Sequence, residues 1–128
     1  MKTTTQTDRT GIQMGELNIW AMDKDQGIKH LLLLLTEQLG ADAFAIDERI
    51  NTDLRAIYIC DLDEPGIRAY LYTLGQTQGR YGVHLEYPES SEVNPVYDAF
   101  ENLTLPSLVS ILAVHLDVDE IQPLPVLH

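Results

Sequence analysis

Three consecutive segments in which apolar and polar residues alternate, 55–62, 67–74 and 80–87, constrain the fold of this chain more than any other feature. The segments are rich in isoleucine, tyrosine and valine, which favour strands. Residues 64–67 read Glu-Pro-Gly-Ile, which is typical of a type II turn, and residues 75–79 begin and end with glycine. Strands that follow one another across such short loops pair antiparallel. The sequence therefore predicts a three-stranded antiparallel meander.

The alternation also assigns each side chain of the meander to one face of the sheet, because successive residues of a strand point in opposite directions. The face predicted to cover the core carries Tyr58, Cys60, Leu62, Ile67, Ala69, Leu71, Thr73, Tyr81, Val83, Leu85 and Tyr87. The opposite face carries Ile57, Ile59, Asp61, Arg68, Tyr70, Tyr72, Leu74, Arg80, His84 and Glu86. In the register that follows, Arg68 lies across from Glu86 and Tyr70 across from His84, and opposite charges so placed stabilise a sheet.

Two helices are predicted from local signals on either side of the meander. Residues 26–39 have an apolar stripe at helical spacing, with Asp25 as the N-cap and Gly40 just past the end. Residues 31–35 are all leucine, so this helix is apolar on more than one side. Residues 106–116 form a second helix, with Thr104 or Leu105 near its cap, and are so apolar that we expect packing on most sides.

Three further segments are predicted from weaker patterns. Residues 16–22 fit a short strand, and residues 41–54 fit either a strand or a short helix. Residues 94–95, Asn-Pro, are typical of a helix start. The apolar stripe of that helix would be Val96, Tyr97, Phe100 and Leu103.

These elements predict an α+β fold: an antiparallel β-meander of three to four strands with an N-terminal helix and two C-terminal helices packed on one face. A chain of 128 residues is expected to form one domain. We expect that domain to span residues 16–116. It would lie between a flexible tail of residues 1–15 and an acidic, proline-containing extended tail of residues 117–128.

The net charge of the chain makes some classes of binding partner unfavourable. It has 20 acidic and 8 basic residues, a net charge of -12. Nucleic acids and anionic membranes attract basic proteins, so we expect neither as a direct partner. No Lys or Arg follows Arg80, whereas eight acidic residues do, which indicates either a solubilising surface or a face for a basic protein. A single cysteine, no secretory signal and no apolar stretch of membrane-spanning length favour a cytoplasmic location.

Patterns that would indicate catalysis or a cofactor fail on inspection. Cys60 and His84 fall on different predicted faces, so they cannot form a nucleophile–base pair. The two Asp-x-Asp-Glu tetrads, 61–64 and 117–120, do not fit a calcium loop and are interpreted as turns or helix caps. The four histidines lack zinc spacing, and no phosphate loop, dinucleotide fingerprint or nucleophile elbow occurs. We therefore expect no catalytic site, no cofactor and no metal.

The face opposite the predicted core is the candidate binding surface, because tyrosine and arginine are enriched where proteins bind one another. Its candidate partner-binding residues are Arg68, Tyr70, Tyr72, Arg80 and His84. The predicted function is that of a small acidic cytoplasmic protein-binding module, of an adaptor, chaperone-like or inhibitor/immunity type. The size, acidity and order of elements resemble those of secretion-effector chaperones and small immunity or inhibitor proteins, and no motif specific to either is present.

Two alternatives stay open at this point. One is an acidic decoy that mimics the charge of nucleic acid and blocks a basic enzyme. The other is a small-ligand-binding or enzymatic domain that uses the same face. The apolar character of residues 26–39 and of the tyrosine-bearing face also exceeds what one small domain can cover. We therefore expect a homodimer that buries one of these two surfaces.

Overall fold

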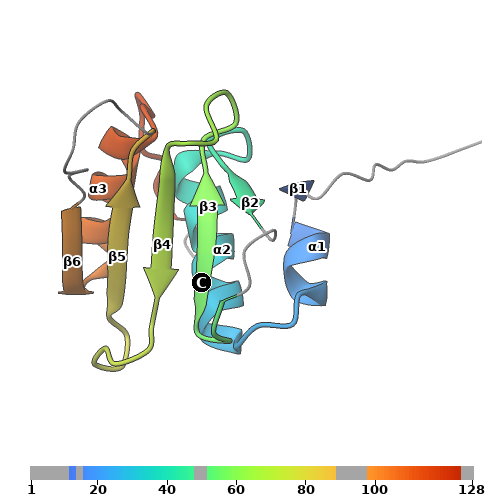
Figure 1. Cartoon of the computed structure of the whole chain (residues 1–128), viewed down its shortest axis with the longest axis vertical. Coiled ribbons are helices and arrows are strands. Elements are labelled where there is room, and N and C mark those ends of the chain that lie inside the picture. The colour runs from blue at the N-terminus through green and yellow to red at the C-terminus, as the bar shows by residue number, and fades with distance from the viewer. Residues whose placement is uncertain (1–11, 14–15, 48–51, 89–97, 125–128) are drawn as a thin grey trace, which may run out of the picture.

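The computed structural model describes residues 12–13, 16–47, 52–88 and 98–124. Within these residues the protein is an α+β domain, in which a six-stranded antiparallel sheet has two long helices on one of its faces (Figure 1). The strands lie side by side in chain order. The elements are β1 (Ile12–Gln13), α1 (Glu16–Ala21), α2 (Gln26–Leu39), β2 (Ala45–Asp47), β3 (Ala56–Cys60), β4 (Arg68–Tyr72), β5 (Tyr81–Glu86), β6 (Asp98–Leu103) and α3 (Leu105–His115).

The predicted class and the central meander are confirmed, as strands β3, β4 and β5. The sheet is larger than the predicted three to four strands, because β1 and β2 extend it on one side and β6 on the other. Residues 41–54, which fitted either a strand or a helix, contain β2 at Ala45–Asp47. The predicted tail of residues 1–15 lies mostly outside the described residues, but Ile12 and Gln13 pair with β2 as β1. Of the predicted tail of residues 117–128, only residues 125–128 lie outside them.

Helix α2 forms where the sequence predicts it. The Asp25 carboxylate accepts a hydrogen bond from the N–H of Gly27 at 3.1 Å, which caps a helix N-terminus as expected. Gly40 ends the helix with a φ of 104°, a conformation that side chains disfavour. The buried stripe consists of Ile28, Leu31, Leu32, Leu35 and Leu39. This stripe packs against the sheet.

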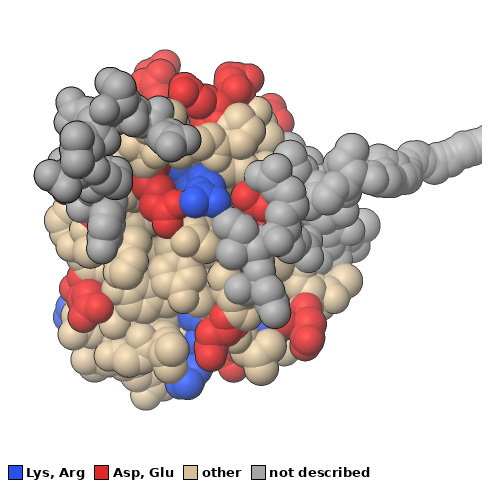
Figure 2. Space-filling view, viewed as in Figure 1, with Lys and Arg blue, Asp and Glu red and all other residues tan. Residues whose placement is uncertain are grey.

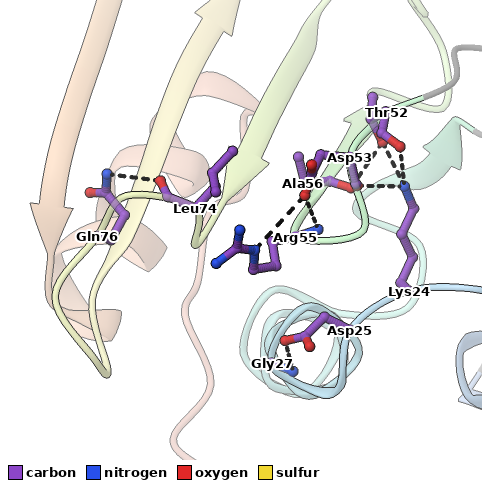
Figure 3. Close-up of polar contacts among 9 residues, drawn as sticks. All are labelled: Lys24, Asp25, Gly27, Thr52, Asp53, Arg55, Ala56, Leu74 and Gln76. Carbon is purple, nitrogen blue, oxygen red and sulfur yellow. Dashed lines mark hydrogen bonds and ion pairs between the residues drawn. The ribbon is translucent and has the colours of Figure 1, made fainter.

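The residues just before α2 are hydrogen-bonded to the residues just before β3 (Figure 3). The Lys24 ammonium donates hydrogen bonds to the Thr52 hydroxyl at 2.6 Å and to the carbonyl of Asp53 at 2.9 Å. The N–H of Asp25 donates to the carbonyl of Leu54 at 2.9 Å. The beginning of α2 is therefore fixed against the beginning of β3.

Two segments adopt a different structure from the one predicted. Residues 16–22 do not form a strand: α1 is a helix, and Ile19 and Met22, three residues apart, both enter the core. No helix begins in the described residues after residue 94 until α3, because residues 98–103 form strand β6. The reason is that β5 offers an edge of unpaired backbone groups, and pairing with that edge outweighs a weak helical stripe.

Helix α3 has the predicted N-cap, but it is less buried than the sequence predicts. The Thr104 hydroxyl accepts a hydrogen bond from the N–H of Ser107 at 3.3 Å. Leu108 and Leu112 are fully buried, whereas Val114 is 84% exposed. The prediction that α3 packs on most sides was therefore wrong. The helix buries one side against β5, and its other side is exposed although that side is also apolar.

The core lies between the sheet and the helices, and it corrects the predicted face of β3. Ile57 and Ile59 are 2% and 0% exposed and belong to the core cluster. Tyr58, which was predicted to be in the core, points to the opposite face. A one-residue error in register reverses every side chain of a strand. The observed register places Ile59 across from the buried Ala69, and Cys60 across from Arg68. The predicted turn is present, with the N–H of Ile67 donating to the carbonyl of Glu64 at 2.9 Å, but Gly66 lacks the positive φ of a type II turn.

The residues after α3 run back against the end of α2. The N–H of Gln122 donates to the carbonyl of Gln38 at 2.8 Å, and the Gln38 amide donates to the carbonyl of Gln122 at 3.1 Å. This part of the predicted tail is therefore attached to the domain.

Candidate functional site: the open face of the sheet

The face of the sheet that α2 and α3 leave open carries the candidate site. Four cross-strand neighbours form a row over β2 to β5: Asp47, Tyr58, Tyr70 and His84. Figure 2 views this face and shows uncharged side chains over its middle, with acidic groups mainly along the margins. We call the cluster of Tyr58, Arg68, Tyr70, Tyr72 and His84 the aromatic face.

The rings of the aromatic face touch one another without interruption. The ring centroids of Tyr58 and Tyr70 are 5.0 Å apart, and those of Tyr70 and Tyr72 are 5.5 Å apart. His84 lies 5.7 Å from Tyr70 and 5.2 Å from Tyr72. Aromatic pairs attract at these separations and tilts. The result is a platform whose side chains hold one another in place.

An ion pair fixes one end of this platform. The guanidinium of Arg68 pairs with the carboxylate of Glu86, its partner across the strands, as the sequence predicts. The guanidinium also lies 4.8 Å from the ring centroid of Tyr58, within cation–π range. The Tyr58 hydroxyl donates to Glu86 at 2.8 Å. Burial, and then this hydrogen bond, raise the pKa of Tyr58 to about 12, so its phenol is a hydrogen-bond donor at neutral pH.

Tyr72 is held in the same manner on the other side. Its hydroxyl donates to a carboxylate oxygen of Glu101 on β6 at 2.9 Å and lies 3.3 Å from His84 Nε2. Burial, and then the bond to Glu101, raise the pKa of Tyr72 to about 12. Its ring lies over Gly82, where a Cβ would be only 2.2 Å from Tyr72 Cζ. Gly82 therefore provides the space in which this ring lies.

The structure brings four of the five predicted residues together and separates the fifth. Arg68, Tyr70, Tyr72 and His84 share the aromatic face. Arg80 instead lies at the end of the hairpin, where it donates a hydrogen bond to the carbonyl of Asn102 at 2.8 Å.

Sequence reasoning missed three residues of this surface. Tyr58 was assigned to the other face, Glu101 to a helix, and the buried Asp47 to an ambiguous segment. One signal could have found Tyr58: in the run Ala-Ile-Tyr-Ile-Cys, the two isoleucines are the stronger core residues.

Cys60 and His84 lie on the same face, so the reason given for excluding a catalytic pair was wrong. Cys60 pairs with Arg68 on the next strand, and His84 lies one strand further and two residues along. Strands are about 4.8 Å apart, which leaves the two backbones on the order of 10 Å apart. A nucleophile and its base need to be about 3 Å apart. Cys60 is 1% exposed, so the predicted burial of its thiol is confirmed, on the opposite face.

The acidic tetrad at residues 61–64 forms the predicted turn. The Asp61 carboxylate accepts hydrogen bonds from the N–H groups of Asp63 and Glu64, each at 3.0 Å. In the second tetrad, Asp117 follows α3 with a φ of 58°. Among the described residues, no group of three or more His, Cys, Asp or Glu side chains is arranged to hold a metal ion.

Comparisons with protein-family models, with curated proteins and with solved structures found no match to this chain. Within the described residues, no helix has both the length and the apolar character that crossing a membrane requires.

Proposed function

We propose that this protein is a non-enzymatic protein-binding module and that the aromatic face is its binding surface. The observation that carries the proposal is the row of contacting rings on a sheet face that no described helix covers. Tyrosine and arginine are enriched among the residues that supply most of the energy of protein interfaces, and tyrosine buries a large area with few rotatable bonds. Here both residue types are already held by neighbours, which lowers the entropy lost on binding.

The shape of the surface favours a macromolecule over a small ligand. Small-ligand sites are concave and enclose most of the ligand. Two hollows of the molecule, of about 770 Å³ and about 530 Å³, are lined by residues outside the aromatic face. A row of rings on the pleated surface of a sheet is instead suited in shape to contact with the surface of another protein.

The charges on the aromatic face indicate the chemistry of the partner. Glu86 and Glu101 each accept a hydrogen bond from a tyrosine, and one base, Arg68, lies beside them. The half-buried rings of Tyr58, Tyr70 and His84 lie beside carboxylates. This combination suits apolar and basic side chains, since a cation is attracted both to the face of a ring and to a carboxylate. The same carboxylates oppose a phosphate backbone, so the partner is a protein rather than a nucleic acid.

The test is capture from a lysate of the native host, with the wild-type chain and two variants compared. Tyr70→Glu places a charge in the middle of the ring row. Gln26→Glu adds the same charge at the exposed start of α2, on the far side of the sheet, and serves as the control. We expect Tyr70→Glu to abolish capture of a defined protein that wild type and Gln26→Glu both retain.

Binding is then measured by calorimetry with that protein purified. We expect Tyr70→Glu and Arg68→Ala each to weaken binding at least tenfold, about 1.4 kcal/mol. Equal affinities for wild type and both variants, with folding verified by urea unfolding, would refute the proposed surface.

A further inference from the structure

Glu86, at one end of the aromatic face, divides its two carboxylate oxygens between two partners from its own chain. Its Oε2 accepts a hydrogen bond from the Tyr58 hydroxyl at 2.8 Å, and its Oε1 pairs with the guanidinium of Arg68. The same guanidinium lies 4.8 Å from the centroid of the Tyr58 ring. A tyrosine, a carboxylate and an arginine therefore form a closed triangle in which each member contacts the other two.

Glu101, on the other side of the aromatic face, repeats two members of this triangle. Its Oε2 accepts a hydrogen bond from the Tyr72 hydroxyl at 2.9 Å. Among the described residues, no donor bonds to its Oε1 and no base forms an ion pair with it. Arg80 donates instead to the carbonyl of Asn102 at 2.8 Å. Glu101 therefore has one carboxylate oxygen that can accept from a base of another molecule.

A bound group can reach Glu101 and would meet a ring there. Glu101 is exposed, and so is the small side chain of Ala99, which lies across from His84. Glu101 and the Nε2 of His84 both contact the Tyr72 hydroxyl, the latter at 3.3 Å. The Tyr72 ring is only 7% exposed, so the half-buried ring of His84 is the one that a group bound to Glu101 would contact.

We propose that Glu101 and His84 form a binding site for an arginine side chain of the partner protein. This inference rests on the proposed function and names the chemistry that the aromatic face recognises beside β6. A guanidinium is planar, so it can stack on a ring while its N–H groups donate to a carboxylate. The ammonium of lysine is compact and strongly hydrated, and it lacks the flat surface that stacks. Arg68 uses both contacts of the guanidinium in the triangle with Tyr58 and Glu86.

The charges of the chain favour a cation at this position. A net charge of -12 attracts a basic protein. An ion pair contributes little while both groups stay in water. A partner that covers the aromatic face removes water from Glu101, and a carboxylate that loses water without gaining a cation is unfavourable. An arginine of the partner replaces that water, so a partner without one should bind more weakly.

The test uses three short synthetic peptides as probes, each with one variable residue between two leucines. The variable residue is arginine, lysine or citrulline, which has the shape of arginine without its charge. Binding to the full chain is followed by NMR titration of the backbone amide signals. We expect the arginine peptide to bind at least fivefold more tightly than the other two and to shift the signals of Ala99 and Glu101. An arginine peptide that bound no more tightly than the lysine or citrulline peptide would overturn the proposal.

A pair of variants separates the site from the general attraction of an acidic protein for a cation. Glu101→Gln removes the charge but keeps an oxygen that can accept from Tyr72, and it should bind the arginine peptide at least fivefold more weakly than wild type. Glu37→Gln removes the same charge at an exposed position of α2 and should bind like wild type. Equal affinities for wild type and Glu101→Gln would overturn the arginine site. The proposed function fails on a different result, a Tyr70→Glu variant that binds the captured protein as tightly as wild type does.

Discussion

Replacing Gly82 with alanine should destabilise the protein by about 2–4 kcal/mol, because the new methyl group would occupy the space of the Tyr72 ring. The added Cβ would lie 2.2 Å from Tyr72 Cζ and 2.3 Å from Cε2. The ring would have to withdraw by about 1 Å, and overpacking of this kind costs about 1–3 kcal/mol. Withdrawal also stretches the 2.9 Å bond to Glu101, and a hydrogen bond to a charged group contributes about 1.5–3 kcal/mol.

The backbone itself does not oppose the change. Gly82 lies in a strand and does not have a positive φ, so alanine can adopt its conformation. In a strand interior, alanine is favoured over glycine by roughly 0.5–1 kcal/mol. The sign of the effect should therefore depend on Tyr72. In a Tyr72→Ala background, Gly82→Ala should be neutral or stabilising by up to about 1 kcal/mol.

Urea unfolding of the four proteins in this cycle measures the free energies directly. Gly27→Ala is a matched control: the nearest atom to its new Cβ is a flexible carboxylate oxygen of Asp25 at 3.3 Å, and its helical position favours alanine. It should raise stability. If Gly82→Ala cost the same with and without the Tyr72 ring, the steric explanation would be refuted.

Three further predictions concern the core, the thiol and the phenols. Leu112→Ala should cost about 2–5 kcal/mol in urea unfolding, whereas the exposed Leu54→Ala should cost under about 0.5 kcal/mol. Cys60 should react with a thiol reagent only as fast as the protein unfolds, and rapid labelling of the native state would contradict its burial. The pKa values of Tyr58 and Tyr72, raised to about 12, mean that the folded state holds both protons more tightly than the unfolded state. Stability should therefore be complete below pH 10 and fall as pH rises toward 12, which absorbance titration of the phenolates and unfolding at each pH will check.

The parts of the fold that the sequence predicted correctly depend on signals within a few residues. Helix α2 has its cap and its stop beside its apolar stripe, and α3 has Thr104 at its start. The β4–β5 register was predictable because a short glycine-bounded loop brings Arg68 across from Glu86. Most of the candidate site followed from that register, since Tyr70 and Tyr72 lie on the same face as Arg68.

The predictions that failed concern elements whose structure is decided by contacts with other parts of the chain. The face of β3 is decided by its pairing with β4, in which Cys60 lies across from Arg68, and the alternation within β3 does not reveal that pairing. Strand β6 was predicted to be a helix because Phe100 and Leu103 fit a helical stripe. Only their pairing with the edge of β5 shows that these residues belong to a strand. Val114 is exposed because one helix cannot be covered on both sides by a single sheet.

The order of the strands has a consequence for how quickly the chain folds. Every strand pairs with the strand that follows it in the sequence, so β3, β4 and β5 can associate by closing loops of only a few residues. Closing a short loop loses little chain entropy, and proteins dominated by such local pairings fold fastest. The pairing of β1 with β2 is different, because it joins Ile12 to Asp47 across both intervening helices. We therefore expect the central hairpins to assemble early in the folding reaction and β1 to join the sheet last.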